Sequence, residues 1–454
     1  MMKRRDWLRT ASGMALAAAL PSGVGIAADS SVLIKNVTLI DGTGRAPRAG
    51  TWVLVEGDRI AAIRDRAIKA PKGAAVIDGR GKFLIPGLMD THVHLDGGRR
   101  GAMGTERTLV IDKDIGRRML HGYLYSGVTA VYDCGNHDKF VFAMRDDERS
   151  GRLQSPRIFA TGHLITRVGG YAASGGGATI DTAEQGMKDL DVLLPQKPDL
   201  VKFTLATRSI GSNAQLPPMD VDVLHRLFLY ANERGFRTTI HAVEQDLQRA
   251  AIHAGVDALA HPVYLTETDD NLAHLIAAKG IPVSTTLIVL KNISMVANDP
   301  SFFEEPLYKM VMAPEDLAFY RDSERKRYLA LGMARWGDES FRFAAANVRK
   351  IYDAGGILAL GTDRTIGPSV HQELELIVGL GIAPIEALKI GTLNAAKYLR
   401  IEDKLGSIEE GKIADMVMLD ADPLADIRNT KTINTVVLGG KLVDRSKLDL
   451  PGNA

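Results

Sequence analysis

FLIPGLMDTHVH, the stretch at residues 83–94, joins a short apolar run to two histidines, His92 and His94. A short apolar run bounded by Pro and Gly is typical of a buried β-strand. Side chains two positions apart in an extended chain point the same way, so both imidazoles can face one ion. Neutral imidazole is a common ligand of zinc and similar ions. The stretch therefore predicts a buried strand that ends in a metal-binding pair.

After this stretch, strand patterns alternate with helical patterns, which predicts parallel β-α-β units. Two helical patterns, residues 219–235 and 268–280, each end in a glycine, a usual helix stop. The candidate strands are KFLIPGLMD (82–90), GVTAVYD (127–133), PRIFATG (156–162), DLVKFT (199–204), FRTTIHA (236–242), VDALAH (256–261), IPVSTT (281–286) and GILALGTD (356–363). Eight strands with helical crossovers predict an α/β fold, a (β/α)8 TIM-type barrel. A doubly wound open sheet is the alternative.

The regions that flank this α/β pattern have a different character. Residues 31–85 and the C-terminal stretch contain short strand patterns separated by Gly, Pro and Asp turns. We therefore expect a small β-sandwich domain built from residues 29–85 and 405–454, and a barrel domain over residues 86–404. Within the barrel, residues 287–350 exceed a normal connection and predict a mostly helical insertion or lid.

The N-terminal segment has the pattern of a targeting signal. A basic start with Lys3, Arg4 and Arg5 is followed by an apolar run and then by small residues up to Ala28. This order is typical of a secretory signal peptide, and the arginine pair resembles a twin-arginine signal. A basic patch before an ordinary signal peptide is the alternative. We expect residues 1–28 to be the signal peptide and the mature protein to be periplasmic or secreted.

The composition excludes several classes of partner. The 454 residues carry 56 basic and 55 acidic side chains, a formal net charge of +1, so no basic field exists to attract nucleic acid. The apolar run at residues 14–20 is too short to span a bilayer, so we expect no stable membrane span. The one cysteine, Cys134, excludes an intrachain disulfide and is best explained as a small packed residue. We expect a homo-oligomer that acts on a small molecule.

Polar side chains recur at or near the carboxyl ends of the predicted strands. They are His92 and His94 after the first strand, Lys202 in the fourth, His241 in the fifth, His261 in the sixth and Asp363 in the eighth. Barrel enzymes build their sites at this face. Taken singly, each residue has an ordinary explanation, since Asp363 could cap a helix and Lys202 could form a salt bridge. Six of them in this order together predict a metal site.

Longer motifs extend the pattern over nearly the whole mature chain. They are FLIPGLMDTHVHL, SGVTAVYDCG, DLVKF, TTIHA, DALAHP, ILALGTD, IEALKIGTLNAAKYL and LGSIEEGKIADMVMLDADPL, in this order. With these motifs the chain resembles the amidohydrolase superfamily, in particular its binuclear-metal imidazolonepropionase-related and prolidase-like branch. The resemblance implies a hydrolase that acts on carbon–nitrogen bonds with two divalent metal ions. Zn2+ is the first candidate for these ions.

The resemblance also implies a role for each of the six residues. These roles are His92 and His94 on the more buried ion, His241 and His261 on the other, Lys202 as a bridge between the ions, and Asp363 on one ion. A protonated lysine has no lone pair for a metal, so family precedent implies that Lys202 is N6-carboxylated. The implied mechanism is attack by a metal-bridged hydroxide, with Asp363 as general base and then general acid.

Four further polar residues are candidate substrate contacts. They are His163 and Tyr171 after the third strand, Arg364 beside the candidate acid–base, and His371 at the start of the final helix. His163 and Tyr171 could hydrogen-bond a carbonyl oxygen as it becomes an oxyanion. Prolidase-like relatives usually carry GGH where this chain has GGY, so Tyr171 departs from their pattern. Arg364 could bind a substrate carboxylate or form a structural ion pair.

These observations predict a hydrolase that cleaves an amide bond in a small molecule, a dipeptide or an N-acyl amino acid. The first alternative is a hydrolase of lactones, carbamates or aryl amides, including toxins of the ochratoxin kind that some relatives cleave, because a fold alone does not choose a substrate. A large apolar pocket under residues 287–350 would favour that alternative. A non-catalytic binding protein is a third hypothesis, disfavoured because all six ligand positions hold competent residues.

Overall fold

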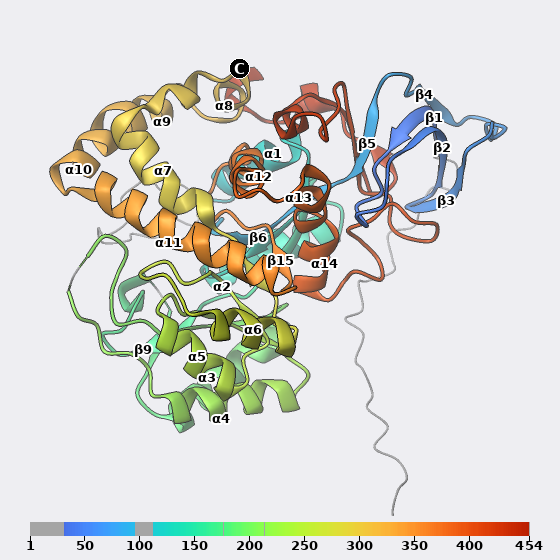
Figure 1. The fold of residues 1–454 in the computed structure, drawn as a ribbon. Helices are drawn as coiled ribbons and strands as arrows, with labels where there is room; N and C mark the ends of the chain where they lie inside the picture. Colours follow the sequence, from blue (N-terminus) through green and yellow to red (C-terminus); the bar gives the residue numbers. More distant parts are fainter. Residues whose placement is uncertain (1–30, 96–111, 176, 213, 454) are drawn as a thin grey trace, which may run out of the picture.

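The computed structural model describes residues 31–95, 112–175, 177–212 and 214–453. The predicted signal peptide, residues 1–28, lies outside the described residues. The described chain combines two parallel sheets, helices that connect their strands, and a mixed sheet at one side (Figure 1). The alternation of strand and helix patterns in the sequence correctly predicted this α/β class.

The two parallel sheets carry the predicted strands. One sheet has the order β6 (Leu88–Val93), β7 (Val128–Asp133) and β8 (Arg157–Ala160). The other has the order β10 (Ala178–Ile180), β9 (Ile165–Arg167), β11 (Val201–Thr204), β12 (Thr238–His241), β13 (Ala258–Leu259), β14 (Val283–Ser284) and β15 (Leu358–Ala359). From β11 to β15, neighbours in space are neighbours in sequence. A doubly wound sheet instead reverses its strand order midway.

Backbone hydrogen bonds continue from one parallel sheet to the other. Thr91 N of β6 donates to Leu360 O, just after β15, at 2.8 Å, and the two residues are 269 positions apart in the chain. At the opposite edge, Asp199 N donates to Ala160 O of β8 at 2.8 Å. The first and last parallel strands are therefore neighbours in space.

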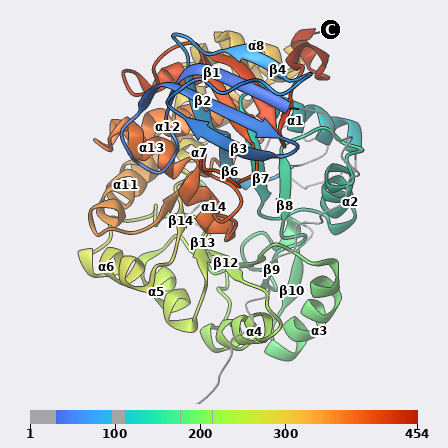
Figure 2. The ribbon, with the colours of Figure 1, turned by 90° about the vertical axis from the view of Figure 1, so that its right-hand side faces the viewer.

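Helices follow most of the parallel strands. They are α1 (Lys113–Tyr125), α2 (Asp138–Arg149), α3 (Ala183–Leu193), α4 (Val221–Glu233), α5 (Gln245–Ala254), α6 (Asp270–Lys279), α12 (Ser369–Gly379), α13 (Pro384–Ile390) and α14 (Leu393–Leu399). Gly235 after α4 and Gly280 after α6 have φ of +82° and +62°, the left-handed conformation that ends many helices. Figures 1 and 2 show α3 to α6 grouped at the end of the molecule away from the mixed sheet.

The mixed sheet is built from both ends of the described chain (Figure 2). Its strands are β1 (Ser31–Leu39), β2 (Arg48–Glu56), β3 (Arg59–Arg64), β4 (Ala75–Asp78), β5 (Phe83–Pro86), β16 (Met416–Leu419), β17 (Ile433–Leu438) and β18 (Lys441–Leu442). The junction is the antiparallel pair β16 and β5, in which Met416 faces Pro86. Hydrogen bonds connect all eight strands into one sheet, in which β18 and β3 lie at opposite ends of the strand order.

Between β14 and β15 the chain is almost entirely helical. The helices are α7 (Leu287–Asn298), η3 (Pro300–Glu304), α8 (Pro306–Val311), α9 (Pro314–Phe319), η4 (Tyr320–Glu324), α10 (Arg325–Ala330) and α11 (Met333–Asp353). They form a cluster of their own around Phe303, Tyr308 and Tyr328, which Ile366 joins from the loop after β15. Figures 1 and 2 show this helical insertion on the side of the molecule opposite the mixed sheet.

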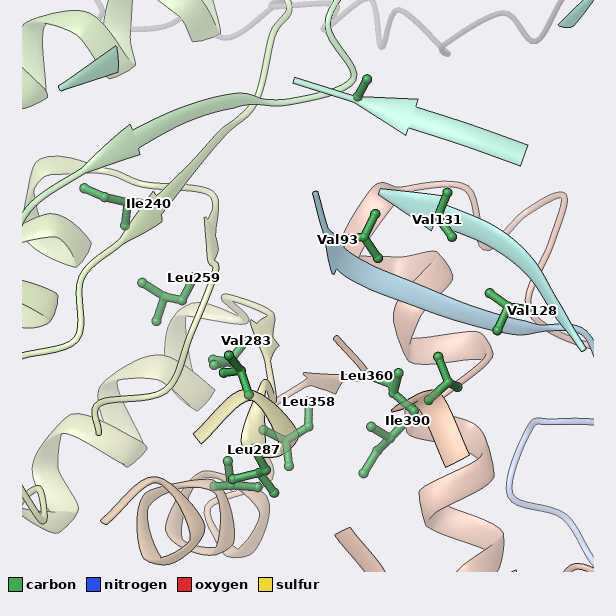
Figure 3. Packing of buried hydrophobic residues seen from close by; sticks show 14 of the residues in the cluster. Val93, Val128, Val131, Ile240, Leu259, Val283, Leu287, Leu358, Leu360 and Ile390 are labelled. Atoms are coloured by element: carbon green, nitrogen blue, oxygen red, sulfur yellow. The ribbon is translucent and has the colours of Figure 1, made fainter. Parts of the chain in front are cut away.

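The main core lies along the parallel strands. Figure 3 shows Val93, Ile240, Leu259, Val283 and Leu358, buried side chains that come from both parallel sheets. Each is at most 1% exposed, so the strands contribute a continuous apolar layer that supports the polar residues at their ends. Among the helices that the structure describes, none has the length and apolar character that crossing a bilayer requires.

Gly87 forms the passage from β5 of the mixed sheet to β6 of the parallel sheet. A Cβ at this position would lie 2.1 Å from Thr129 Oγ1 of β7, so only glycine fits against that strand. We expect Gly87→Ala to lower the apparent melting temperature, because overpacking of this kind costs about 1–3 kcal/mol.

Gly379→Ala is the matched control, since a Cβ at this helical position meets no heavy atom within 4 Å. It should be neutral or stabilising by about 0.5–1 kcal/mol, because alanine is the better helix former. Thermal unfolding followed by circular dichroism measures both variants. Equal melting temperatures for the two variants would contradict the close packing of Gly87.

Candidate metal centre

Three strand ends converge on one buried cluster. His92 of β6, His261 after β13 and Asp363 after β15 each offer one ligand atom, and the three atoms lie within 4.8 Å of one another. His92 is 1% and His261 3% exposed, and Asp363 is mostly buried. Imidazole nitrogens and a carboxylate oxygen at such separations can bind a single divalent ion.

Two further histidines border this cluster. His94 Nε2 lies 3.4 Å from Asp363 Oδ1, the oxygen that His92 Nε2 approaches to 3.7 Å. The His241 ring centroid is 4.6 Å from that of His261, and His241 Nε2 is buried without a hydrogen-bond partner among the described residues. A buried polar atom without a partner costs free energy, and a metal ion bound at this nitrogen would remove that cost. The donor set therefore fits a metal ion.

Lys202 lies within β11 and is only 3% exposed. Burial lowers the pKa of its ammonium, an effect that the charges of Cys134 and Asp363 partly oppose. Its own charge contributes to the lowered pKa of His241. An ammonium offers no lone pair to a metal, so Lys202 suits such a centre only after its Nζ has been modified.

The outer nitrogens of three histidines are held by hydrogen bonds. His92 Nδ1 lies 2.9 Å from Ala260 O, and His94 Nδ1 lies 2.8 Å from Gly135 O. His261 Nδ1 lies 3.0 Å from Thr286 Oγ1. A carbonyl acceptor requires a proton on Nδ1 and so leaves the Nε2 lone pair of His92 and His94 free for a metal.

The protonation states also suit metal binding. Burial lowers the pKa of His241 to about 3 and the pKa values of His92 and His261 well below 6.5. Burial acts in the same direction on His94, but the Asp363 carboxylate, 3.4 Å from its Nε2, raises the pKa of His94 above its ordinary value. Burial raises the pKa of Asp363, yet its interactions with His92, His94 and Lys202 hold that pKa below its ordinary value. Mostly neutral imidazoles and an ionised carboxylate are the forms that bind metals.

Two buried carboxylates that sequence reasoning missed hold the strand ends in place. Asp90 accepts hydrogen bonds from Thr362 Oγ1 at 2.6 Å and from His92 N at 3.1 Å, and burial raises the pKa of Asp90 to about 8. Asp133 accepts a hydrogen bond from Leu95 N at 2.7 Å. The only sequence signal for these roles is that each acid ends an apolar run.

Aromatic rings cover one side of the histidine cluster. Tyr171 stacks on His241 with a centroid distance of 4.0 Å and an interplanar angle of 14°. Tyr264 lies 6.1 Å from His261, and Trp336 of α11 lies 6.2 Å from Tyr264, both edge to face. The predicted contact of Tyr171 with substrate stays a prediction, and sequence reasoning missed Tyr264 and Trp336.

The structure does not support the predicted substrate contact at His163. Its Nδ1 lies 2.9 Å from Asp138 Oδ2 of α2, and its Nε2 lies 2.9 Å from Asp189 Oδ2 of α3. Burial alone would lower the pKa of His163, but these two hydrogen bonds raise it to about 9. The protonated ring therefore connects two helices and has no nitrogen left for an oxyanion.

His371 likewise has no access to a substrate. The side chain is fully buried, its Nδ1 lies 3.0 Å from Thr430 Oγ1, and its Nε2 lies 3.1 Å from Ser126 O. Arg364, in contrast, follows Asp363 directly and has no salt bridge to a described residue within 4.0 Å. Both nitrogens of His371 therefore have partners within the fold, and the structural ion pair considered for Arg364 is absent from the described residues.

Comparison with known proteins is consistent with this geometry. The sequence model of the amidohydrolase family matches residues 83–443. Imidazolonepropionase of Brevibacillus brevis is 26% identical, over 97% of this chain and 98% of that protein, and ochratoxinase of Aspergillus niger is 24% identical, over 89% and 85%. The crystal structure of a Xaa-Pro dipeptidase with bound methionine aligns with a TM-score of 0.74 at 24% identity, over 91% of this chain and 99% of that chain. At this identity the structural match shows a shared fold.

The hydrogen bonds of His163 to Asp138 and Asp189 predict a specific pH dependence of the free energy of unfolding. Because its folded pKa, about 9, exceeds the ordinary 6.5, its contribution is fully present below pH 6.5 and is lost as the pH rises through 9. His163→Gln should therefore lower the melting temperature more at pH 6 than at pH 9.5. Thermal unfolding at both pH values measures this difference. A loss in His163→Gln that does not depend on pH would contradict the stabilising role of these two hydrogen bonds.

Proposed function

This chain belongs to the amidohydrolase family, in its imidazolonepropionase-related and prolidase-like branch, and is a hydrolase of carbon–nitrogen bonds; we propose that it cleaves the amide bond of a dipeptide or an N-acyl amino acid. One observation carries this proposal. His92, His261 and Asp363 gather their ligand atoms within 4.8 Å at the carboxyl ends of parallel strands, with His94 and His241 beside them.

We further propose that the parallel strands close into a (β/α)8 barrel over residues 86–404. The hydrogen bond between Thr91 and Leu360 and the one between Asp199 and Ala160 support closure, because they link both edges of the three-stranded sheet to the other parallel sheet. In this proposal residues 29–85 and 405–454 form the accompanying β domain. Residues 287–350 would be a lid over the centre.

We propose that the six residues predicted from the sequence hold two divalent ions, with Zn2+ as the first candidate. Such ions lower the pKa of a bound water and polarise a carbonyl group. His92, His94, His241 and His261 would supply neutral nitrogens, Asp363 a carboxylate oxygen, and Lys202 the oxygens of an N6-carboxylate. The buried and unpartnered Nε2 of His241 supports this assignment, as does the burial of Lys202 inside the donor set.

Asp363 is the proposed acid–base. It lies where the histidines converge, and the pKa that they hold low keeps the carboxylate ionised before reaction. In the proposed hydrolysis, Asp363 accepts a proton from the attacking water as the oxygen adds to the carbonyl carbon. It then delivers this proton to the leaving nitrogen as the C–N bond breaks, so that a carboxylic acid and an amine are formed.

Aryl amides, lactones and carbamates are the second candidate substrates. The aromatic rings of Tyr171, Tyr264 and Trp336 beside the cluster favour this class, because they offer a planar apolar surface to a substrate ring. The similarity to ochratoxinase agrees with it.

We also propose that residues 1–28 direct export to the periplasm by the twin-arginine route, and that the mature enzyme is a homo-oligomer.

A substrate panel tests the proposed function. The zinc-loaded enzyme is expected to hydrolyse Xaa-Pro or Xaa-Arg dipeptides or N-acyl amino acids with a higher kcat/KM than chromogenic lactones or aryl carbamates. Release of free amine or of chromophore measures both classes under the same conditions. A higher kcat/KM for a lactone or carbamate would favour the second candidate, and no turnover of any amide would contradict the proposal.

Lys202→Ala tests the metal centre. We expect this variant to lose most of one metal ion per chain and nearly all turnover, because two divalent ions repel each other without a shared anion. Formate, acetate or bicarbonate should restore part of both losses by occupying the vacant bridge. Metal content by mass spectrometry and amide turnover measure the effect.

Lys188→Ala, a change on the exposed face of α3, is the matched control and should keep metal and activity. Asp363→Asn should keep much of the metal and still lose turnover, since it removes the proton acceptor. If Lys202→Ala keeps two metal ions and a near-normal rate, the centre is not bridged by this lysine. A single ion held by His92, His94, His241 and Asp363 would then be the better description.

A further inference from the structure

Arg364 lies at the edge of the proposed metal centre, directly after Asp363. Its backbone pairs with Val93 of β6 in a parallel bridge, and its carbonyl oxygen accepts a hydrogen bond from Tyr123 Oη at 2.7 Å. The charge of Asp363 acts on its guanidinium. The backbone of Arg364 is therefore held at a defined place beside the strand that carries His92.

The guanidinium of Arg364 has no acceptor among the described residues. Its Nε is buried and makes no hydrogen bond. The two terminal nitrogens also make no hydrogen bond to a described residue, and they are accessible to solvent. Arginine always carries its charge, and a partly buried charge without a partner costs free energy. This open end of the guanidinium is thus a place where an anion would be favoured.

Tyrosines of the helical insertion surround this guanidinium. Arg364 Cζ lies 5.9 Å from the ring centroid of Tyr320, which is within the range of cation–π attraction. Burial raises the pKa values of Tyr308 and Tyr328, and the charge of Arg364 opposes both rises, which places these hydroxyls near it. The insertion therefore contributes aromatic side chains to the surroundings of the cation.

The carboxylates of the same region are engaged with other cations. Glu324 pairs with Arg327 at 2.7 Å. Glu305 and Glu375 both pair with Lys431, at 2.9 Å and 2.7 Å. Since each of these acids already has a counter-ion, an acceptor for the free guanidinium is more readily supplied by a bound molecule.

We propose that Arg364 anchors a carboxylate of the substrate, so that the enzyme prefers amides that bear a free carboxylate near the scissile bond. This inference rests on the proposed amide hydrolysis. The planar guanidinium can donate two parallel hydrogen bonds to a carboxylate, which fixes both the position and the orientation of the substrate. Because Arg364 follows Asp363, an anchored carboxylate lies on the side of the centre that faces the insertion. Neutral lactones, carbamates and anilides lack the group that this subsite binds.

Matched pairs of substrates test this subsite. N-acyl amino acids and dipeptides are compared with their carboxamides, which keep the scissile bond and lose the charge. The unchanged enzyme should prefer the acid of each pair. Arg364→Met should lower kcat/KM for the acid by about 10- to 100-fold, the range for a hydrogen bond to a charged group, and change that of the carboxamide by less than about threefold. Arg364→Lys should retain an intermediate preference.

Arg342→Met is the matched control, because Arg342 is an exposed arginine of α11 that stacks near Phe343 and not near the centre. It should leave the ratio of acid to carboxamide unchanged. Circular dichroism and metal content show whether Arg364→Met is folded and loaded. Binding of an N-acetyl amino acid and its carboxamide, measured by calorimetry, gives a second readout that does not depend on turnover, and Arg364→Met should weaken only the acid.

Three outcomes separate this inference from the proposed function. Equal rates for acids and carboxamides in the unchanged enzyme, or an equal loss of both in Arg364→Met, would overturn the carboxylate anchor while leaving amide hydrolysis intact. Turnover of lactones alone, with no amide hydrolysed, would overturn the proposed function. In that case the calorimetric preference for the acid still decides whether Arg364 binds a carboxylate.

Discussion

The contact between the first and the last parallel strand is the constraint on which the site depends. Asp363 N donates to His92 O at 2.7 Å, and the buried carboxylate of Asp90 binds Thr362 on the opposite strand. These bonds place the candidate acid–base beside the histidine pair of β6. Without them, the ends of β6 and β15 would be free to separate, and the carboxylate would lose its place in the donor set. The contact between the ends of β6 and β15 therefore also assembles the site.

Burial gives this donor set its chemical character. Removing imidazoles from water disfavours their charged form, which is why the pKa values of His92, His241 and His261 are lowered. The same burial lowers the pKa of Lys202 and leaves the Nε2 of His241 without a hydrogen-bond partner among the described residues. Burial of such groups lowers the free energy of unfolding of the metal-free chain. Binding of cations would offset that cost, so folding and metal loading are expected to be coupled.

The helical insertion contributes what the parallel strands do not. Trp336 reaches Tyr264 beside the histidines, and Tyr320 lies against Arg364. These side chains come from α11 and η4, so the insertion forms part of the surroundings of the centre. Strand ends supply the candidate reacting groups, whereas the insertion supplies groups that can distinguish one amide from another. The aromatic rings and the unpartnered guanidinium are complementary in this respect. The rings can stack on a planar group of a substrate, and the guanidinium can bind an anionic group.

The amino-acid sequence by itself determined the strands, the helix ends and the candidate ligands, because these depend on local periodicity and on motifs such as DTHVH. Only the tertiary structure decided the roles of the isolated residues. His163 is neutralised by Asp138 and Asp189, 25 and 26 positions away, and His371 is buried against a residue 59 positions later. No local pattern encodes such partners, since the charge state and access of a side chain depend on what folding places around it. For the same reason the sequence left Arg364 with two explanations. The fold favoured one of them, because no described carboxylate lies within salt-bridge distance of the guanidinium.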